Sequence, residues 1–444
     1  MTLSLRKTLL TTALVAAAAL PSTSAQALNI VLRADSSFTS QPGGADALFA
    51  FRKAANYWNK TLTNDATLYF NISYAPLAPN TIAQAGSNST YATVSSIYNA
   101  LAANSVTPLD QIAVANLRPL TAAGGLGYRM PDSVTGIAGT GNGLGLETAT
   151  RGSVYDNDDT DNNLYAYANT ANLKALGIKF DTDFTDFGDN SDADLTFSSA
   201  FNFDFDPTDG ITPGTQDFIS VAVHEMGHAL GFVSGTDLYD FYANPNGPGR
   251  NGPYGNSYNW DDQPVLSVLD LFRASTNPPS AAGWDPVTGL RYLQLDPNRG
   301  AGFSIDGKTF FNQDVNFAEF STGRYNGDGE QASHWVEGRG FYDENGCFFP
   351  SPAEVGIMDP TSGDCQVGFV TGSDLAAFDA IGYNLNFDIL KNQNYVFTTR
   401  DIYNLAGLAA VPEPALWAQL ILGFGVIGGT LRRTRARKVS VTYA

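Results

Sequence analysis

The chain has 444 residues, a formal net charge of −19 at pH 7 and a hydrophobic content of 43%. This apolar content is sufficient for a sizeable core, and the length allows more than one domain. The acidic charge argues against a nucleic acid partner, because binding to phosphates requires clustered Lys and Arg side chains.

The N-terminus resembles a secretory signal peptide. Arg6 and Lys7 precede an apolar stretch at residues 9–20, and residues 25–27 read Ala-Gln-Ala. A short basic region, an apolar run and a small-x-small site are typical of such signals. We therefore expect residues 1–27 to be removed during export.

The next region predicts a domain in which helices pack on a mixed sheet. Residues 29–33 (NIVLR), 67–74 (TLYFNISY) and 195–205 are β-rich, and residues 45–62 have apolar side chains at helical spacing. A strand, a helix and a further strand in this order predict an α+β fold with helices on a twisted sheet.

An acidic run at residues 156–161 (DNDDTD) follows a stretch without clear periodicity. Its carboxylates could bind Ca²⁺, although it lacks the glycine and the terminal glutamate of an EF-hand loop. A solvated acidic loop is the favoured interpretation, because most acidic runs are simply exposed.

The strongest motif is VAVHEMGHALGF at residues 221–232. His224 and His228 are four residues apart, so on a helix they project from one face and can bind one ion. A catalytic zinc usually has three protein ligands and a water. Glu225 lies beside the first ligand and could act as the general base that takes a proton from the attacking water. Gly231 could end the helix in a left-handed turn.

An HExxH string can also arise by chance, with ordinary histidines. The chain has only three histidines, and two of them fall in this apolar segment. Buried histidines need polar partners, which favours the metal site. A glutamate on the following helix is excluded as the third ligand, because no glutamate lies between Glu225 and Glu319. The candidates are Asp237, Asp240 and His334.

The segments HEMGHALGF, Ser333-His334-Trp335 and Ile357-Met358-Asp359-Pro360 together resemble the leishmanolysin-type metzincins. The likeness extends to bacterial metallopeptidases with PEP-CTERM tails, through DLFRAS, FSIDGKTFF, GDGEQASHW and DLAAFDAIGYNL. It implies that His334 is the third zinc ligand after a long insertion and that Met358 forms a turn beneath the metal. It also implies peptide cleavage at a zincin-like fold.

From this resemblance we expect a catalytic subdomain at residues 28–234, an insertion at 235–333 and a more irregular C-terminal subdomain at 334–410, with a cleft between the upper and lower parts. A peptide substrate would pair with a sheet edge, for which residues 195–205 are the candidate. Independently of the resemblance, Ser373 is expected to cap a final helix from Asp374 to Ile381, which Gly382 would end.

The only two cysteines are Cys347 and Cys365. In an oxidising compartment such a pair most simply forms one disulfide. A thiolate metal site would need further soft ligands.

The C-terminus resembles a PEP-CTERM sorting tail. Residues 411–438 contain Pro-Glu-Pro, an apolar stretch and a cluster of arginines, followed by residues 439–444. Such a tail implies transient residence in the membrane and a final location that is secreted or at the surface of a Gram-negative bacterium. A single-span membrane anchor is the alternative.

These features predict a secreted zinc endopeptidase with a protein or peptide substrate. An exported surface or matrix protein with a zinc-bearing but non-proteolytic fold is the alternative. The presence of Glu225 argues against it, because a purely structural zinc site needs no base.

Overall fold

The computed structural model describes residues 28–407 except 80, 132–152, 244–245, 252–259, 278–282, 313–316, 339, 345–346, 351–353, 362 and 364. The expected signal peptide at 1–27, the sorting tail at 411–438 and residues 439–444 lie outside the described residues. Within the described part of the chain, no helix has the length and apolar character needed to cross a bilayer.

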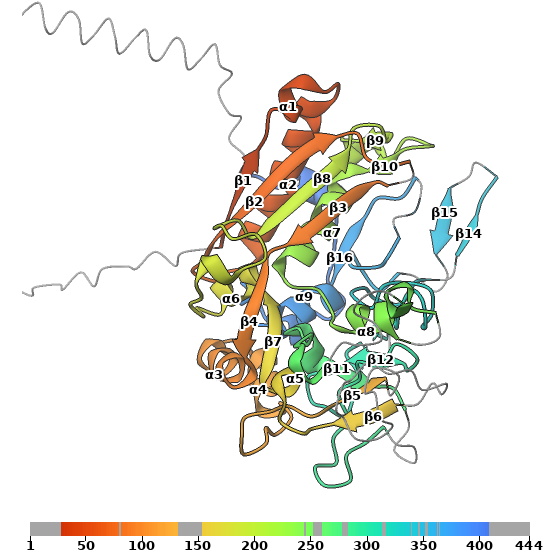
Figure 1. Cartoon of the computed structure of the whole chain (residues 1–444). Coiled ribbons are helices and arrows are strands. Elements are labelled where there is room, and N and C mark those ends of the chain that lie inside the picture. The colour runs from red at the N-terminus through yellow and green to blue at the C-terminus, as the bar shows by residue number, and fades with distance from the viewer. Residues whose placement is uncertain are drawn as a thin grey trace, which may run out of the picture.

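A four-stranded mixed sheet forms the upper part of the molecule (Figure 1). Its strands are β1 (Asn29–Ala34), β2 (Thr67–Ala75), β8 (Ala193–Ser198) and β3 (Ala83–Ser87), in the order β1-β2-β8-β3. The first three strands run parallel, and β3 pairs antiparallel with β8. The predicted strands at 29–33 and 67–74 are confirmed, whereas the strand predicted at 195–205 ends at Ser198.

Two long helices pack behind this sheet, α2 (Gly44–Thr61) and α7 (Phe218–Leu230). Alternate residues of β2 are buried, as the period-two pattern requires when one face packs on helices. The indole nitrogen of Trp58 on α2 donates a hydrogen bond to the carbonyl oxygen of Val223 on α7 at 3.3 Å. The two helices are therefore joined in the core directly behind the metal motif.

The remaining helices and strands are shorter, and in the described part of the chain these strands form one three-stranded and five two-stranded sheets, none of which closes. They are α1 (Ser37–Ser40), β4 (Ser89–Thr93), α3 (Val94–Asn104), α4 (Pro108–Ala115), β5 (Tyr128–Pro131), β6 (Ser153–Asp156), α5 (Asp161–Leu164), β7 (Tyr165–Asn169), α6 (Thr170–Ala175), β9 (Phe203–Asp204), β10 (Gln216–Asp217), α8 (Thr236–Tyr242), β11 (Arg273–Ser275), β12 (Ala301–Phe303), β13 (Glu319–Phe320), β14 (Gly340–Tyr342), β15 (Phe348–Pro350), β16 (Phe369–Thr371), α9 (Gly372–Ala380), β17 (Val396–Thr398) and α10 (Thr399–Asn404). The predicted mixed α+β class is confirmed.

Two local predictions need correction. The C-terminal helix α9 begins at Gly372 with Thr371 as its cap, because the Thr371 hydroxyl accepts from the backbone of Asp374 and the Asp374 carboxylate accepts from the backbone of Thr371. The acidic run at 156–161 is only partly solvated, since Asp156 is buried with an exposed fraction of 1%.

Candidate metal centre

Helix α7 carries two of the three histidines and has defined ends. The Asp217 carboxylate caps its start by accepting from the backbone nitrogen of Ser220 at 3.1 Å. At its end Gly231 adopts a φ of 119°, a left-handed conformation that glycine tolerates best. The predicted helix stop at Gly231 is confirmed.

All three histidines of the chain meet at one point. The Nε2 atom of His228 lies 3.0 Å from that of His224 and 3.1 Å from that of His334, and the His224 and His334 atoms are 3.3 Å apart. His334 follows His228 by 106 residues and lies in the loop before Trp335. The fold thus brings the end of the long insertion back to helix α7.

The opposite ring nitrogens determine which tautomer each histidine adopts. Nδ1 of His224 faces the carbonyl oxygen of Ile357 at 2.7 Å, Nδ1 of His228 faces that of Phe232 at 2.8 Å, and Nδ1 of His334 faces that of Gln331 at 3.2 Å. A carbonyl oxygen can only accept, so each Nδ1 carries the proton and each Nε2 presents a lone pair.

The surroundings of the three imidazoles favour their neutral forms. Burial lowers the pKa of His224, burial and the neighbouring His224 lower that of His228 to about 3, and burial with both neighbours lowers that of His334 well below its usual range. Three lone pairs that converge without protons repel one another unless a cation lies between them. The group can therefore hold a metal ion.

The separations fit a tetrahedral ion. Metal–nitrogen bonds of about 2.0–2.1 Å, as zinc makes with imidazole, place the ligand nitrogens about 3.3 Å apart. The observed separations of 3.0–3.3 Å are close to this value.

Glu225 lies beside the histidines without joining them. It is half-buried on α7 and lines the same cavity, and its carboxylate makes no side-chain hydrogen bond to another described residue. Burial raises the pKa of its carboxyl to about 7. A carboxylate in such a position can exchange a proton with a water in the cavity.

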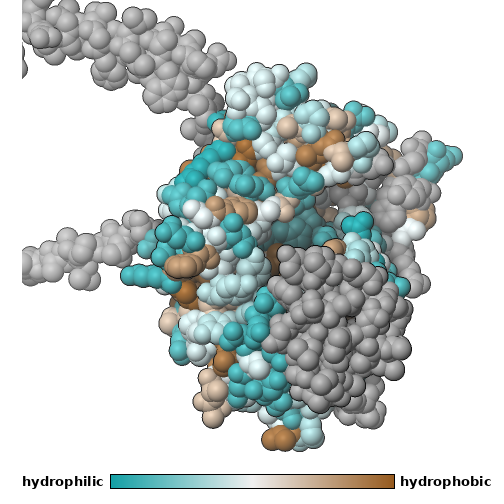
Figure 2. Space-filling view, viewed as in Figure 1, coloured by the Kyte–Doolittle hydropathy of each residue, from teal (hydrophilic) through white to brown (hydrophobic). Residues whose placement is uncertain are grey.

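The histidines and Glu225 lie on a cleft with a volume of about 1250 Å³. Residues 81–87 of β3 and its preceding loop line one side, and segments 329–334 and 354–369 line the other. The sheet edge predicted at 195–205 is wrong, because β8 is paired on both sides and β3 is the edge strand. On the face shown in Figure 2 the coloured surface is mostly hydrophilic, and its hydrophobic residues form small separate patches.

Met358 is packed directly under the metal helix. Its sulfur lies against Gly227, where a Cβ atom would approach it to 2.4 Å. The carbonyl oxygen of Met358 accepts from the backbone nitrogen of Trp335 at 3.0 Å, so the turn at Met358 is tied to the residue after His334.

Asp374 is a supporting residue that the sequence did not identify. Its carboxylate is buried and accepts from the backbone nitrogens of Ile357 and Met358 at 2.9 and 3.3 Å and from the indole nitrogen of Trp335 at 2.8 Å. It therefore fixes both the carbonyl that orients His224 and the residue next to His334. The sequence signal that could have identified it is the spacing of Thr371 and Asp374, which is that of a capping box.

Asp237 and Asp240 do not join the histidines. The Asp237 carboxylate accepts from the backbone nitrogens of Ala332 and Ser333 at 2.7 and 3.1 Å. The Asp240 carboxylate accepts from those of Tyr325 and Asn326 at 2.8 and 2.7 Å. Both aspartates instead bind the backbone of the segment that leads to His334. Of the three candidates for the third ligand, only His334 lies beside His224 and His228.

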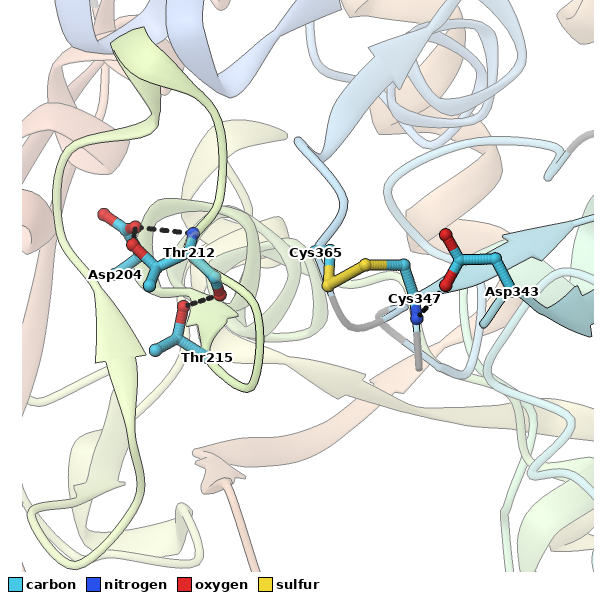
Figure 3. Close-up of a disulfide and its surroundings, with 6 residues drawn as sticks. All are labelled: Asp204, Thr212, Thr215, Asp343, Cys347 and Cys365. Atoms are coloured by element: carbon cyan, nitrogen blue, oxygen red, sulfur yellow. Dashed lines mark hydrogen bonds between the residues drawn. A yellow bond between two sulfur atoms is a disulfide. The ribbon is translucent and has the colours of Figure 1, made fainter. Parts of the chain in front are cut away.

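The predicted disulfide between Cys347 and Cys365 is present, with Cα atoms 5.3 Å apart (Figure 3). The backbone nitrogen of Cys347 donates to the carboxylate of Asp343 at 2.9 Å. The bridge closes a loop that contains Met358, and this loop forms part of the cleft wall.

Comparison of the chain with models of known families, with curated proteins and with solved structures finds no match in any of the three. The resemblance carried by the segments around His224, His334 and Met358 stays a hypothesis.

Proposed function

We propose that the chain is a zinc-dependent endopeptidase of the leishmanolysin-like metzincin type. The observation that carries the proposal is the convergence of His224, His228 and His334 at the floor of a cleft that also contains Glu225. The segments around these residues supply the family likeness. Export through residues 1–27 and a PEP-CTERM tail at 411–438 is part of the same proposal.

The donor set suits zinc because it consists of three neutral imidazoles with space beside them. When bound, zinc supplies Lewis acidity that polarises a carbonyl group and makes water more acidic. A structural site usually closes all four positions with protein ligands, whereas this group opens on the cleft.

Glu225 would take a proton from the attacking water and later pass it to the leaving amine. Its place on α7, one residue after His224, keeps it beside the histidines without making it a ligand. The Nδ1–carbonyl hydrogen bonds keep the rings from turning away during the reaction.

The substrate would lie along β3 as an added strand. The side of β3 that does not face β8 lines the cleft, and an edge strand has unpaired backbone donors and acceptors that an extended peptide can use. This pairing would place a peptide bond across the histidines.

The test is hydrolysis of casein by residues 28–410, compared with Glu225→Gln and with the zinc content of both proteins. We expect zinc in both and a rate about 10²–10⁴-fold lower in the variant. If both proteins hold zinc and neither cleaves a protein, the exported surface or matrix interpretation is favoured. If neither holds zinc, the proposal is wrong.

A further inference from the structure

A second group of side chains that could bind a metal ion lies where β6 and α5 approach a short 3-10 helix, Trp260–Asp262. Figure 1 shows β6 and α5 in the lower half of the molecule. None of Asp156, Asn163 and Asp261 lines the cleft of the three histidines. The group is therefore separate from the proposed catalytic centre.

Three buried oxygen atoms in this group have no hydrogen-bond partner in the described part of the chain. They are the Oδ1 atoms of Asp156, Asn163 and Asp261. The exposed fractions of these residues are 1%, 0% and 8%, respectively. Burial of a polar atom without a partner is unfavourable, and more so for a carboxylate. Three such acceptors in one region call for a donor or a cation.

A hydrogen-bond network holds two of these side chains together. The other carboxylate oxygen of Asp156 accepts from the amide nitrogens of Asn162 and Asn163 at 2.8 and 3.4 Å. The amide nitrogen of Asn163 donates to Asp156 and to the carbonyl oxygen of Leu126, so both of its hydrogens are used. The amide oxygen of Asn163 remains as an acceptor.

The charges on this group are not compensated. Burial and the charges of Asp158, Asp156 and Asp262 raise the pKa of Asp261 to about 7, and no positive side chain acts on it within the described residues. Burial and Asp158 likewise raise the pKa of Asp156 to about 6. The carboxylates of Asp156 and Asp261 are thus close enough to repel each other.

We propose that Asp156, Asp261 and Asn163 bind one calcium-like divalent cation. Calcium accepts carboxylate and amide oxygens in a flexible shell of six to eight ligands completed by carbonyls and water. Two carboxylates balance its charge, and the negative charge of the exposed Asp158 acts on both of them. Among the described residues no third Asp, Glu, His or Cys joins this group closely enough to form a set of three such ligands, so the remaining ligands would be the Asn163 amide oxygen, backbone carbonyls and water.

The ion would join the segment at residues 153–164 to the insertion. Trp260, next to Asp261, packs against Tyr239 and Tyr242 of α8 with ring centroids 5.5 and 5.2 Å apart. Calcium would therefore stabilise the packing of residues 153–164 on the part of the insertion that contains Trp260 and α8, independently of zinc and of peptidase activity.

The experiment uses the full-length chain, purified with zinc, in buffers stripped of other divalent ions. Ca²⁺ is added while the melting temperature is followed, and Tb³⁺ binding is followed by its luminescence on excitation of the nearby Trp260. Asp156→Asn and Asp261→Asn are compared with Asp206→Asn, which changes an exposed aspartate that caps a turn outside this group.

We expect Ca²⁺ to raise the melting temperature by several degrees at a hundredfold excess over its dissociation constant. It should also displace Tb³⁺ and bind each site variant at least tenfold more weakly than wild type and Asp206→Asn. If either site variant does not fold, the other one and the wild-type displacement decide. The proposal is overturned if Ca²⁺ neither shifts melting nor displaces Tb³⁺, or if the foldable site variants bind Ca²⁺ as wild type does.

Discussion

Single backbone carbonyls orient the imidazole rings of the proposed centre. The carbonyl oxygens of Ile357, Phe232 and Gln331 each accept from one Nδ1 atom. This leaves the three Nε2 atoms free to bind one ion. The sequence predicts the His224–His228 pair because their spacing is local. The place of His334 came from family resemblance, since contacts across 106 residues leave no periodic signal.

Gly227 provides the space for Met358 under the histidines. An alanine there would usually stabilise a helix by about 1 kcal/mol relative to glycine. Here its Cβ would lie 2.4 Å from the Met358 sulfur and 3.4 Å from the ring of Phe378, and overpacking costs about 1–3 kcal/mol. We expect Gly227→Ala to lower the free energy of unfolding in urea and to weaken zinc retention.

The double variant Gly227→Ala, Met358→Ala is the control for this prediction. It restores the space, so its loss of stability should be smaller than the sum of the two single effects. A Gly227→Ala protein that is more stable than wild type would show that the contact with Met358 does not limit the packing.

Among the secondary-structure elements, α9 supports the metal centre through the carboxylate at its first turn. Asp374 and Asp401 are both the third residue of a helix with a threonine capping box, on α9 and α10. Asp374 is buried and also accepts from Ile357, Met358 and Trp335, whereas the capping bonds of Asp401 are exposed.

We expect Asp374→Asn to destabilise the chain by about 2–4 kcal/mol, because an amide nitrogen would face backbone donors. Asp401→Asn should cost about 1 kcal/mol or less. Urea unfolding measures both, and chelator competition should show weaker zinc binding for Asp374→Asn alone. Equal effects of the two changes would contradict a supporting role of Asp374 at the centre.

The contact between α4 and α9 contains two carboxyl groups. Burial and the charge of Asp110 raise the pKa of Asp379, and the hydroxyl of Thr107 donates to Asp379 at 2.9 Å. The folded-state pKa of Asp379 lies above the unfolded value of about 3.9. The contribution of this group to the free energy of unfolding is therefore fully present below the unfolded pKa and is lost as the pH rises through the folded pKa.

Asp379→Asn removes this loss. We therefore expect the variant to gain stability relative to wild type as the pH rises from about 4 through neutrality. Urea unfolding at a series of pH values measures the difference, with Asp206→Asn as an exposed control. A difference that stays constant with pH would exclude ionisation of Asp379 as the cause.

The elements that sequence could predict have strong local patterns, and those it could not depend on distant partners. The alternation in β2 and the apolar spacing in α2 were sufficient to place them. The edge strand β3 has the sequence AQAGS, which carries no strand pattern, and its extended form comes from pairing with β8. The sequence pattern therefore predicts the wrong strand as the edge for a substrate.

For the molecule as a whole, a bound metal would join α7 to the loop that closes the insertion. Since the unfolded chain cannot hold the three histidines together, a bound zinc ion would stabilise the folded state, by about 4 kcal/mol at a thousandfold excess over its dissociation constant. We expect a chelator to lower the melting temperature and added zinc to restore it in calcium-free buffer. His228→Ala should melt at the same temperature with and without chelator, and an unchanged wild-type melting temperature would argue against the centre.

Because all three histidines lie in one place, any signal from an imidazole ring reports on the proposed metal centre. Because the chain contains no other histidine, every imidazole resonance in a proton or nitrogen spectrum comes from this centre. A reagent that modifies histidine can react nowhere else through that side chain. The protonation and occupancy of the centre can therefore be followed without changing the sequence, because no other imidazole contributes to the signal.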